Sequence, residues 1–442
     1  MNINGQHAYP HSYYAATRNR ELNFPALTSA IKADVCIVGG GFSGLATALF
    51  LRESGLDVVL LESSLIGWGA SGRNGGQVVA GYGEDTEEVV SRVHGSAAGQ
   101  RAFELGFTTI ELLKTVIESY QIECDLTWGY VLAAITGRQV DQLKVIVKDL
   151  KQRKPEILGE LVEHGDVGRL VGSSAYRAAL YIKNEEHLPP LNLALGEAKA
   201  IRDLGGQIFE QSTVTNIQYS ANGQAVTVKT DGGQVRADNL VRCGNAYLEK
   251  LEPRLQQTMI PGYSAIIATE PLSAEVRNRL IPHNAAVADM RSVLDYYRFS
   301  ADGRMLWGGL AHWSGADSAN PEPLLRKSMT KIFPELEQAR IEYQWSGRIG
   351  ISANLNPQIG RLAPNVYYAQ AYSGHGVAST HLSGRMIADA ITGHSDDFDM
   401  FASIRHKKVP NIELIHKLGR AWGMNSRRII ELAKSGTKNY CF

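Results

Sequence analysis

The chain has 442 residues, which is long for one compact α/β unit and suggests about two domains. Lysine plus arginine equal aspartate plus glutamate at 45 each, so the charge balance indicates neither a nucleic-acid nor an anionic-membrane partner. No apolar run is long enough to span a membrane, and the polar, aromatic N-terminus lacks the apolar core of a secretory signal. We therefore expect a cytoplasmic protein.

The first predicted element is a buried parallel strand over Val35–Val38. Gly39–Gly44 then fits the pattern G-x-G-x-x-G, and a helix is expected after Gly44, with its free N–H groups directed at phosphates. A second strand, Val58–Leu61, ends at Glu62, where a carboxylate can accept hydrogen bonds from a ribose hydroxyl. The segment predicts a dinucleotide site. Glu62 disfavours a 2′-phosphate, which leaves NAD or FAD.

A second glycine cluster, Gly67–Gln77, favours FAD over NAD. Its small residues allow backbone to lie flat against a large ligand, while Ser71, Arg73 and Asn74 supply hydrogen bonds. A simple NAD dehydrogenase has no use for such a loop here. The alternative, a flexible surface linker, fits less well with the bulky side chains of Trp68 and Arg73.

The middle of the chain predicts a second domain wrapped around the first. Residues 84–152 have helical apolar spacing, interrupted by a strand-like run at 129–135. A helix over Leu191–Leu204, closed by Gly205, precedes a β-rich segment from 207 to 241. Further strands are predicted at Ala265–Thr269, Leu294–Ser300 and Met305–Gly309.

The four cysteines and the histidines show no metal-ligand spacing, so we predict no metal site and treat the thiols as structural.

Three motifs carry a family resemblance. Cys36–Gly44, Gly67–Gln77 and Tyr372–Val377 together resemble the D-amino-acid-oxidase superfamily of flavoproteins. Within it the chain is most similar to the bacterial gamma-glutamylputrescine oxidases, on the narrower signals Ser12–Ala16 and Leu294–Arg298.

The resemblance implies an α/β fold, α+β overall, with a Rossmann-like FAD-binding domain interleaved with a substrate domain built on a mostly antiparallel sheet. The predicted FAD-binding domain is discontinuous and comprises residues 28–85, 160–250 and 345–400. The predicted substrate domain comprises residues 86–159 and 251–344, between an N-terminal extension, 1–27, and a C-terminal tail, 401–442.

The resemblance also implies FAD, bound noncovalently because no cysteine stands near 350–354, where relatives attach flavin. Glu62 would hold the adenosine ribose, Val214 would meet the adenine through its backbone, and Ser373–Val377 would close on the flavin. The predicted cofactor-binding residues are Gly39, Gly41, Phe42, Ser43, Gly44, Glu62, Ser63, Gly69, Ala70, Ser71, Arg73, Asn74, Gly75, Gly76, Gln77, Val214, Gly244, Arg348, Ser373, Gly374, His375, Gly376 and Val377.

On the substrate side, Ala378 stands where sarcosine-oxidizing relatives carry a lysine that grips the substrate carboxylate. An amine with a distant carboxylate, such as gamma-glutamylputrescine, therefore fits better than an α-amino acid. Arg298 or Arg348 would meet that carboxylate, and His375 would act as a flavin-side hydrogen-bonding residue or a base. The candidates for an aromatic slot around the alkyl chain are Tyr263, Tyr296, Tyr297, Trp307 and Trp345. The residues predicted to be catalytic are His375, Tyr297, Trp345 and Arg298.

The reaction implied is hydride transfer from the carbon beside the amine nitrogen to flavin N5. The resulting imine is hydrolysed to an aldehyde and ammonia, and molecular oxygen accepts the electrons to give hydrogen peroxide. Two alternatives stay open: an oxidase of a secondary or cyclic amino acid such as sarcosine or pipecolate, and a flavin dehydrogenase that passes electrons to a quinone or a partner protein. The sequence leaves the oligomeric state undetermined.

Overall fold

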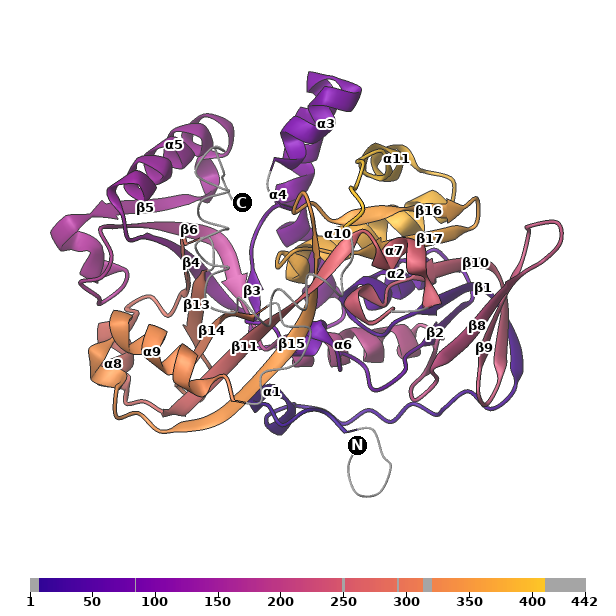
Figure 1. Cartoon of the computed structure of the whole chain (residues 1–442), viewed down its shortest axis with the longest axis horizontal. Coiled ribbons are helices and arrows are strands. Elements are labelled where there is room, and N and C mark those ends of the chain that lie inside the picture. Colours follow the sequence, from indigo (N-terminus) through magenta and orange to yellow (C-terminus); the bar gives the residue numbers. More distant parts are fainter. Residues whose placement is uncertain (1–7, 84, 249–250, 292–293, 313–319, 410–442) are drawn as a thin grey trace.

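The structure is a computed structural model that describes residues 8–409, apart from 84, 249–250, 292–293 and 313–319. Two sheets and the helices that cover them make up the molecule, and each sheet draws its strands from distant parts of the chain (Figure 1). Of the predicted C-terminal tail, 401–442, the residues beyond 409 lie outside the described residues.

The first sheet has a parallel centre built on the predicted strand–turn–helix segment. Strand β1 (Ala30–Val38) pairs in parallel with β2 (Val58–Leu61) on one side and with β10 (Gln234–Arg242) on the other. The last four residues of β1 and all of β2 are buried, as expected for strands covered on both faces. The sheet is completed by β7 (Gln207–Phe209), β8 (Val214–Tyr219), β9 (Val226–Thr230), β16 (Gln358–Ala363) and β17 (Val366–Gln370).

Helix α2 (Phe42–Glu53) follows β1 and lies against the first sheet. It begins at Phe42 with Gly41 as its N-cap, two residues before Gly44, where the glycine pattern predicted the start. Gly44 therefore lies inside the helix, where an added Cβ would come within 2.0 Å of the Gly39 carbonyl oxygen. That close approach of helix to turn needs glycine.

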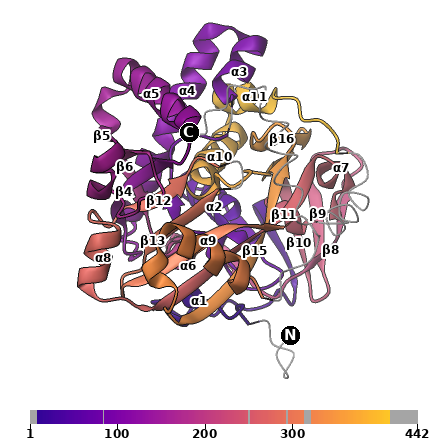
Figure 2. The same ribbon diagram turned by 60° about the vertical axis from the view of Figure 1, so that its left-hand side comes forward.

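Helix α10 (Gly376–Ile391) packs along α2, and α6 (Pro190–Asp203) and α4 (Ser96–Ser119) cover the same core (Figure 2). At the crossing, a Cβ on Gly384 of α10 would lie 2.7 Å from the Thr47 amide nitrogen of α2. Shorter helices are α1 (Tyr13–Ala16), α3 (Thr86–His94), α7 (Pro253–Gln256) and α11 (Asp396–Ala402).

The second sheet is mostly antiparallel, as predicted, and β12 with β4 is its parallel pair among the described strands. Its strands, in spatial order, are β15 (Ile341–Ser352), β11 (Met259–Pro271), β14 (Arg304–His312), β13 (Asp295–Phe299), β12 (Ala286–Asp289), β4 (Thr127–Ala134), β6 (Ala178–His187) and β3 (Gln77–Val78), with β5 (Leu158–Glu163) beside β6. Helix α5 (Gly137–Arg153) packs on one face. Helices α8 (Ala274–Leu280) and α9 (Glu322–Ile332) pack on the other.

The sheet membership differs from the predicted domain boundaries at three places. β6 and most of β5 join the second sheet, although they fall inside 160–250, the range predicted for the FAD-binding domain. β3, inside 28–85, and β15, most of which lies inside 345–400, also belong to the second sheet. The reason is long-range pairing, since local alternation predicts a strand but not the sheet it joins.

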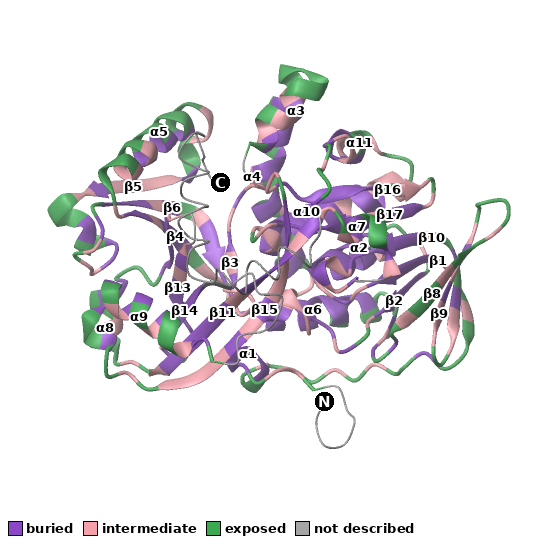
Figure 3. Cartoon of the chain, in the orientation of Figure 1, coloured by how far each residue is buried: buried purple, intermediate pink, exposed green. Residues whose placement is uncertain are grey.

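Burial follows this division. One apolar cluster fills the space between the first sheet and helices α2, α4, α6 and α10, and two further clusters lie on opposite faces of the second sheet. In Figure 3, helices α2 and α10 are coloured mostly as buried. Three cysteines (Cys36, Cys124 and Cys243) are buried and free, in agreement with a structural role.

Candidate functional site

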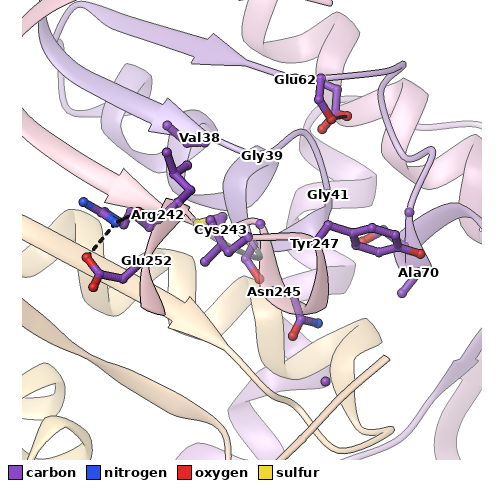
Figure 4. Close-up of a pocket in the computed structure, with 18 of the residues that line it drawn as sticks. Val38, Gly39, Gly41, Glu62, Ala70, Arg242, Cys243, Asn245, Tyr247 and Glu252 are labelled. Atoms are coloured by element: carbon purple, nitrogen blue, oxygen red, sulfur yellow. Dashed lines mark hydrogen bonds and ion pairs between the residues drawn. The ribbon is translucent and has the colours of Figure 1, made fainter. Parts of the chain in front are cut away.

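A cavity of about 780 Å³ opens at the carboxyl ends of β1, β2 and β10. Ligands bind open α/β sheets at this edge, where the chain leaves neighbouring strands in opposite directions. The volume lies in the upper part of the roughly 300–1,000 Å³ range of ligand pockets. Figure 4 shows its lining, with Val38 and Gly39 from β1 and its turn, Glu62 after β2, and Arg242 at the end of β10.

The glycine turn brings backbone to the cavity wall. Gly39 has φ of +112°, and an added Cβ would lie 2.8 Å from the Cys243 carbonyl group. A Cβ on Gly41 would lie 2.8 Å from Ser71 Oγ. Gly39, Gly41, Phe42 and Ser43 line the cavity, so the first N–H groups of α2 and the positive end of its dipole face the ligand position.

Glu62 lies at one end of the cavity with its carboxylate already anchored. Oε2 accepts a hydrogen bond from Gly40 N at 2.7 Å and Oε1 accepts one from Ser64 N at 2.8 Å. Burial raises the pKa of this carboxyl, and the backbone donors oppose that rise. Ser63, Thr213 and Val214 line the same end.

The second glycine loop lies across the N-terminus of α2. Ser71 Oγ accepts a hydrogen bond from Phe42 N at 2.9 Å, and Gly69, Ala70, Ser71 and Asn74 line the cavity. Arg73 is buried behind them, where it donates to the Gly69 carbonyl at 3.1 Å, the Ser346 carbonyl at 3.0 Å and Tyr247 Oη at 2.8 Å.

The turn before α10 closes the opposite end. Ser373 and Gly374 have positive φ, and Ser373, Gly374, Gly376 and Val377 line the cavity. His375 is the N-cap of α10, where its carbonyl accepts from Ser379 Oγ, and its side chain is not part of the cavity lining. A second helix N-terminus therefore faces the same space.

Besides His375, six residues predicted to bind the cofactor lie behind the lining rather than in it. Arg73 and Gly75–Gln77 support the loop, Gly44 lies within α2, and Arg348 lies on β15 beside Tyr247. Gly75 O accepts from Arg298 Nε at 2.7 Å, and Gln77 Nε2 donates to the Val287 carbonyl at 3.1 Å.

The structure does not bring the predicted substrate-side residues Tyr297, Trp345 and Arg298 to this cavity. Tyr297 stacks on Trp307 at 4.3 Å between ring centroids and donates to Tyr176 Oη at 3.0 Å, inside the second-sheet core. Trp345 Nε1 donates to the Arg73 carbonyl at 3.0 Å. Their aromatic and basic character is used for packing and for holding loops.

Several lining residues were not predicted. Arg242 and Glu252 form a buried ion pair at 2.8 Å, drawn in Figure 4, and Asn245 Oδ1 accepts from Ala371 N at 3.1 Å. Tyr247 receives the Arg73 hydrogen bond. In the sequence, the segment 244–248 was the available signal for this part of the lining, but only Gly244 was included among the predicted cofactor-binding residues. A single sequence does not show that this turn folds over the end of β1.

The chemistry of the lining fits a dinucleotide such as FAD. Two helix N-termini, a glycine cradle that side chains would fill, and a carboxylate at one end supply the groups that phosphates and a ribose require. Among the described residues no group of His, Cys, Asp and Glu side chains forms a candidate metal site. The helices within the described ranges include none that is long and apolar enough to cross a membrane.

Comparison with known proteins agrees with this fit. Residues 34–390 match the family described as FAD dependent oxidoreductase. The gamma-glutamylputrescine oxidoreductase of Escherichia coli (strain K12) is 41% identical over 400 residues, which are 90% of this chain and 93% of that protein. A probable oxidoreductase OrdL of Haemophilus influenzae is 37% identical over 95% of this chain and 97% of its own length.

Solved structures share the fold. Glycine oxidase from Geobacillus kaustophilus superposes with a TM-score of 0.71 at 19% identity, covering 86% of this chain and 100% of that one. L-proline dehydrogenase from P. horikoshii gives a TM-score of 0.68 at 21% identity, covering 90% and 99%. With the glycine turn, Glu62 and the cavity in place, this chain belongs to the family of FAD-dependent oxidoreductases.

Proposed function

We propose that this protein oxidises the primary-amine end of gamma-glutamylputrescine, giving an imine that water converts to an aldehyde and ammonia. The observation that carries the proposal is the near full-length similarity to a gamma-glutamylputrescine oxidoreductase. Bound FAD supplies the hydride acceptor, and molecular oxygen is the proposed final acceptor, released as hydrogen peroxide.

The cavity lining supports one direction for the cofactor. The adenosine end would lie by Glu62 and Val214, and the pyrophosphate by the N–H groups at the start of α2. The flavin end would lie between Asn74 and the Ser373–Val377 turn, where the N-terminus of α10 stabilises negative charge. Burial raises the pKa of the lining thiol, Cys243, to about 12, which supports noncovalent binding because a protonated thiol is a weak nucleophile.

An alkyl ammonium has a pKa of about 10, so the substrate amine is protonated near pH 7. It must lose that proton before it can give up a hydride, because the ammonium form carries no lone pair. Apolar, aromatic surroundings favour the neutral amine. We propose Tyr296 as one of these aromatic residues, since its ring lies against the second glycine loop, where a Cβ on Gly75 would come within 2.6 Å of it. Its hydroxyl is hydrogen-bonded to Ser264 Oγ at 2.8 Å.

We propose Arg348 as the partner of the glutamyl carboxylate, because the next two residues of β15, Ile349 and Gly350, line the cavity. Arg298 is engaged elsewhere, with the Gly75 carbonyl. A forked guanidinium–carboxylate pair would orient the long substrate from its far end.

The proposal is tested by mixing the FAD-loaded enzyme with amines in the absence of oxygen and following the flavin absorbance. Gamma-glutamylputrescine should bleach the flavin rapidly, and putrescine, sarcosine and pipecolate should do so far more slowly. Tyr296→Leu should raise KM for the amine. Tyr296→Phe, which keeps the ring, should leave KM close to that of the unaltered enzyme.

Two other outcomes would contradict parts of the proposal. Rapid bleaching by sarcosine or pipecolate, with little by gamma-glutamylputrescine, would identify an oxidase of secondary or cyclic amino acids. Bleaching by gamma-glutamylputrescine followed by very slow reoxidation in air would identify a dehydrogenase that uses another electron acceptor.

A further inference from the structure

A second cavity, of about 230 Å³, lies on the second sheet beside α8. Helix α8 is at the lower left of Figure 1, next to strands β13 and β14. The cavity shares no lining residue with the FAD cavity. Its polar lining is provided by Asp125, Thr127, His187, Arg277, Asn278, Asn284, Arg298 and Ser300.

Arg298 brings a buried positive charge to this cavity. Arg298 is 2% exposed, and it forms no ion pair within the described parts of the chain. Its four hydrogen bonds go to neutral oxygens, namely the carbonyls of Gly75, Phe299 and Leu188 and the hydroxyl of Tyr14. A buried charge without a counter-charge is costly, so a site beside it favours an anion.

The hydrogen-bond count of Arg298 points the same way. A guanidinium carries five N–H donors. The single N–H of Nε and both N–H groups of Nη2 donate hydrogen bonds. Of the two N–H groups of Nη1, one donates to the Phe299 carbonyl. The fifth donor has no acceptor among the residues that the structure describes.

Arg277 adds a second guanidinium to the lining. It is half-buried on α8, and its side chain makes neither an ion pair nor a hydrogen bond with the described residues. The amides of Asn278 and Asn284 supply further donors at the exposed side. Asp125, the carboxylate in the lining, is exposed to solvent and is not paired with either arginine among the described contacts.

The lowered pKa of His187 is consistent with a positive potential in the cavity. Burial, and then the charge of Arg298, lower the pKa of this imidazole to about 3, so it is neutral near pH 7. Its Nε2 lies 2.8 Å from the Asn284 carbonyl, to which it donates. The imidazole therefore adds no charge to the cavity, which leaves the two guanidiniums as its cationic groups.

We propose that this cavity binds a small oxyanion, such as phosphate, between the guanidiniums of Arg277 and Arg298. Bidentate guanidinium–oxyanion contacts are among the strongest polar contacts in proteins. Because Arg298 also holds the Gly75 carbonyl, the bound anion neutralises the charge behind the second glycine loop. The site is independent of the proposed substrate, since it shares no residue with the FAD cavity.

The test is a thermal-shift titration of the FAD-loaded enzyme with inorganic phosphate, with ionic strength held constant by sodium chloride. We expect a saturable rise of the melting midpoint. Arg277→Gln should weaken the apparent phosphate affinity about ten-fold or more, because one charged hydrogen-bond partner is lost. Arg277 suits the test because its side chain supports no described neighbour through a hydrogen bond.

Arg279→Gln is the matched control. Arg279 lies on the same helix, pairs with Glu335 and does not line the cavity, so its variant should keep the full phosphate response. Sulfate and acetate, tested in the same way, distinguish an inorganic oxyanion from a carboxylate, and a response lost in Arg277→Gln supports the site for either anion. The proposal is overturned if phosphate, sulfate and acetate all give no saturable shift, or if Arg277→Gln responds like the unaltered enzyme.

Discussion

At the scale of single residues, the shape of the dinucleotide end of the cavity depends on the absence of a Cβ at two glycines and on one carboxylate. Gly39 and Gly41 each lie so close to neighbouring atoms that a Cβ would meet them at 2.8 Å. Glu62 is held by two backbone N–H groups. These contacts explain why the glycine pattern and the acid were recognisable in the sequence, since a Cβ at either glycine would meet its neighbours and Glu62 supplies two acceptor oxygens.

We predict that Glu62→Gln weakens FAD binding about ten-fold or more. The substituted amide must place an NH₂ group against either Gly40 N–H or Ser64 N–H, both of which now donate to the carboxylate. Loss of a charged acceptor costs roughly 1.5–3 kcal/mol. The measurement is a fluorescence titration of FAD into the apoprotein. Glu53→Gln, at the far exposed end of α2, is the control, and equal affinity for all three proteins would refute the role of Glu62.

At the scale of elements, the site depends on the meeting of α2 and α10, whose N-termini both face the cavity. Ser43 Oγ at the start of α2 donates to Tyr372 Oη, just before α10, at 2.9 Å. Further along, His381 of α10 contacts the buried carboxylate of Glu197 on α6. The two helices are therefore fixed to each other at the cavity wall, and α10 is fixed to α6 further along its length.

We predict that Gly384→Ala destabilises the protein by about 1–3 kcal/mol, the usual cost of overpacking a core. Its Cβ would lie 2.7 Å from Thr47 N and 2.8 Å from Ala46 Cβ, which forces α10 away from α2. Urea unfolding followed by circular dichroism measures the change. Gly137→Ala, in the first turn of α5 with nothing within 4 Å of the added Cβ, should be neutral or stabilising. Equal stability of Gly384→Ala and the parent would show that the crossing tolerates the methyl group.

At the scale of the whole molecule, the second glycine loop joins the two sheets. It leaves the first sheet after β2, yet Arg73 donates to the Ser346 carbonyl of β15, and Trp345 Nε1 donates back to the Arg73 carbonyl. Arg298 of β13 holds the Gly75 carbonyl. A loop that lines the FAD cavity is thus held by contacts with the second sheet.

We predict that Arg73→Gln lowers both the melting midpoint, by several degrees, and the affinity for FAD. The shorter side chain cannot reach all three acceptors, which leaves partly buried oxygens of Gly69, Ser346 and Tyr247 without this donor. Thermal unfolding and FAD titration measure the two effects. Arg92→Gln, an exposed position on α3, is the control. A loss of stability without any loss of FAD affinity would mean that the loop is positioned by other contacts.

The sequence by itself determined the strand–turn–helix unit and Glu62, because backbone geometry restricts the residue type at each of these positions. The cofactor class and the mostly antiparallel second sheet were implied by the family resemblance that the glycine motifs carry. The boundaries of the two sheets required the tertiary structure, because β6 joins the second sheet by pairing with β3, β4 and β5.

Tertiary structure also decided which of the polar and aromatic residues line the cavity. Tyr297, Trp345, Arg298 and Arg73 have the chemistry of site residues, but each is used behind the cavity for packing or for holding a loop. Arg242, Asn245 and Tyr247 were less conspicuous and line it. The physical reason is that a side chain's direction depends on which distant strand or turn packs against it, and no local pattern in the sequence records that choice.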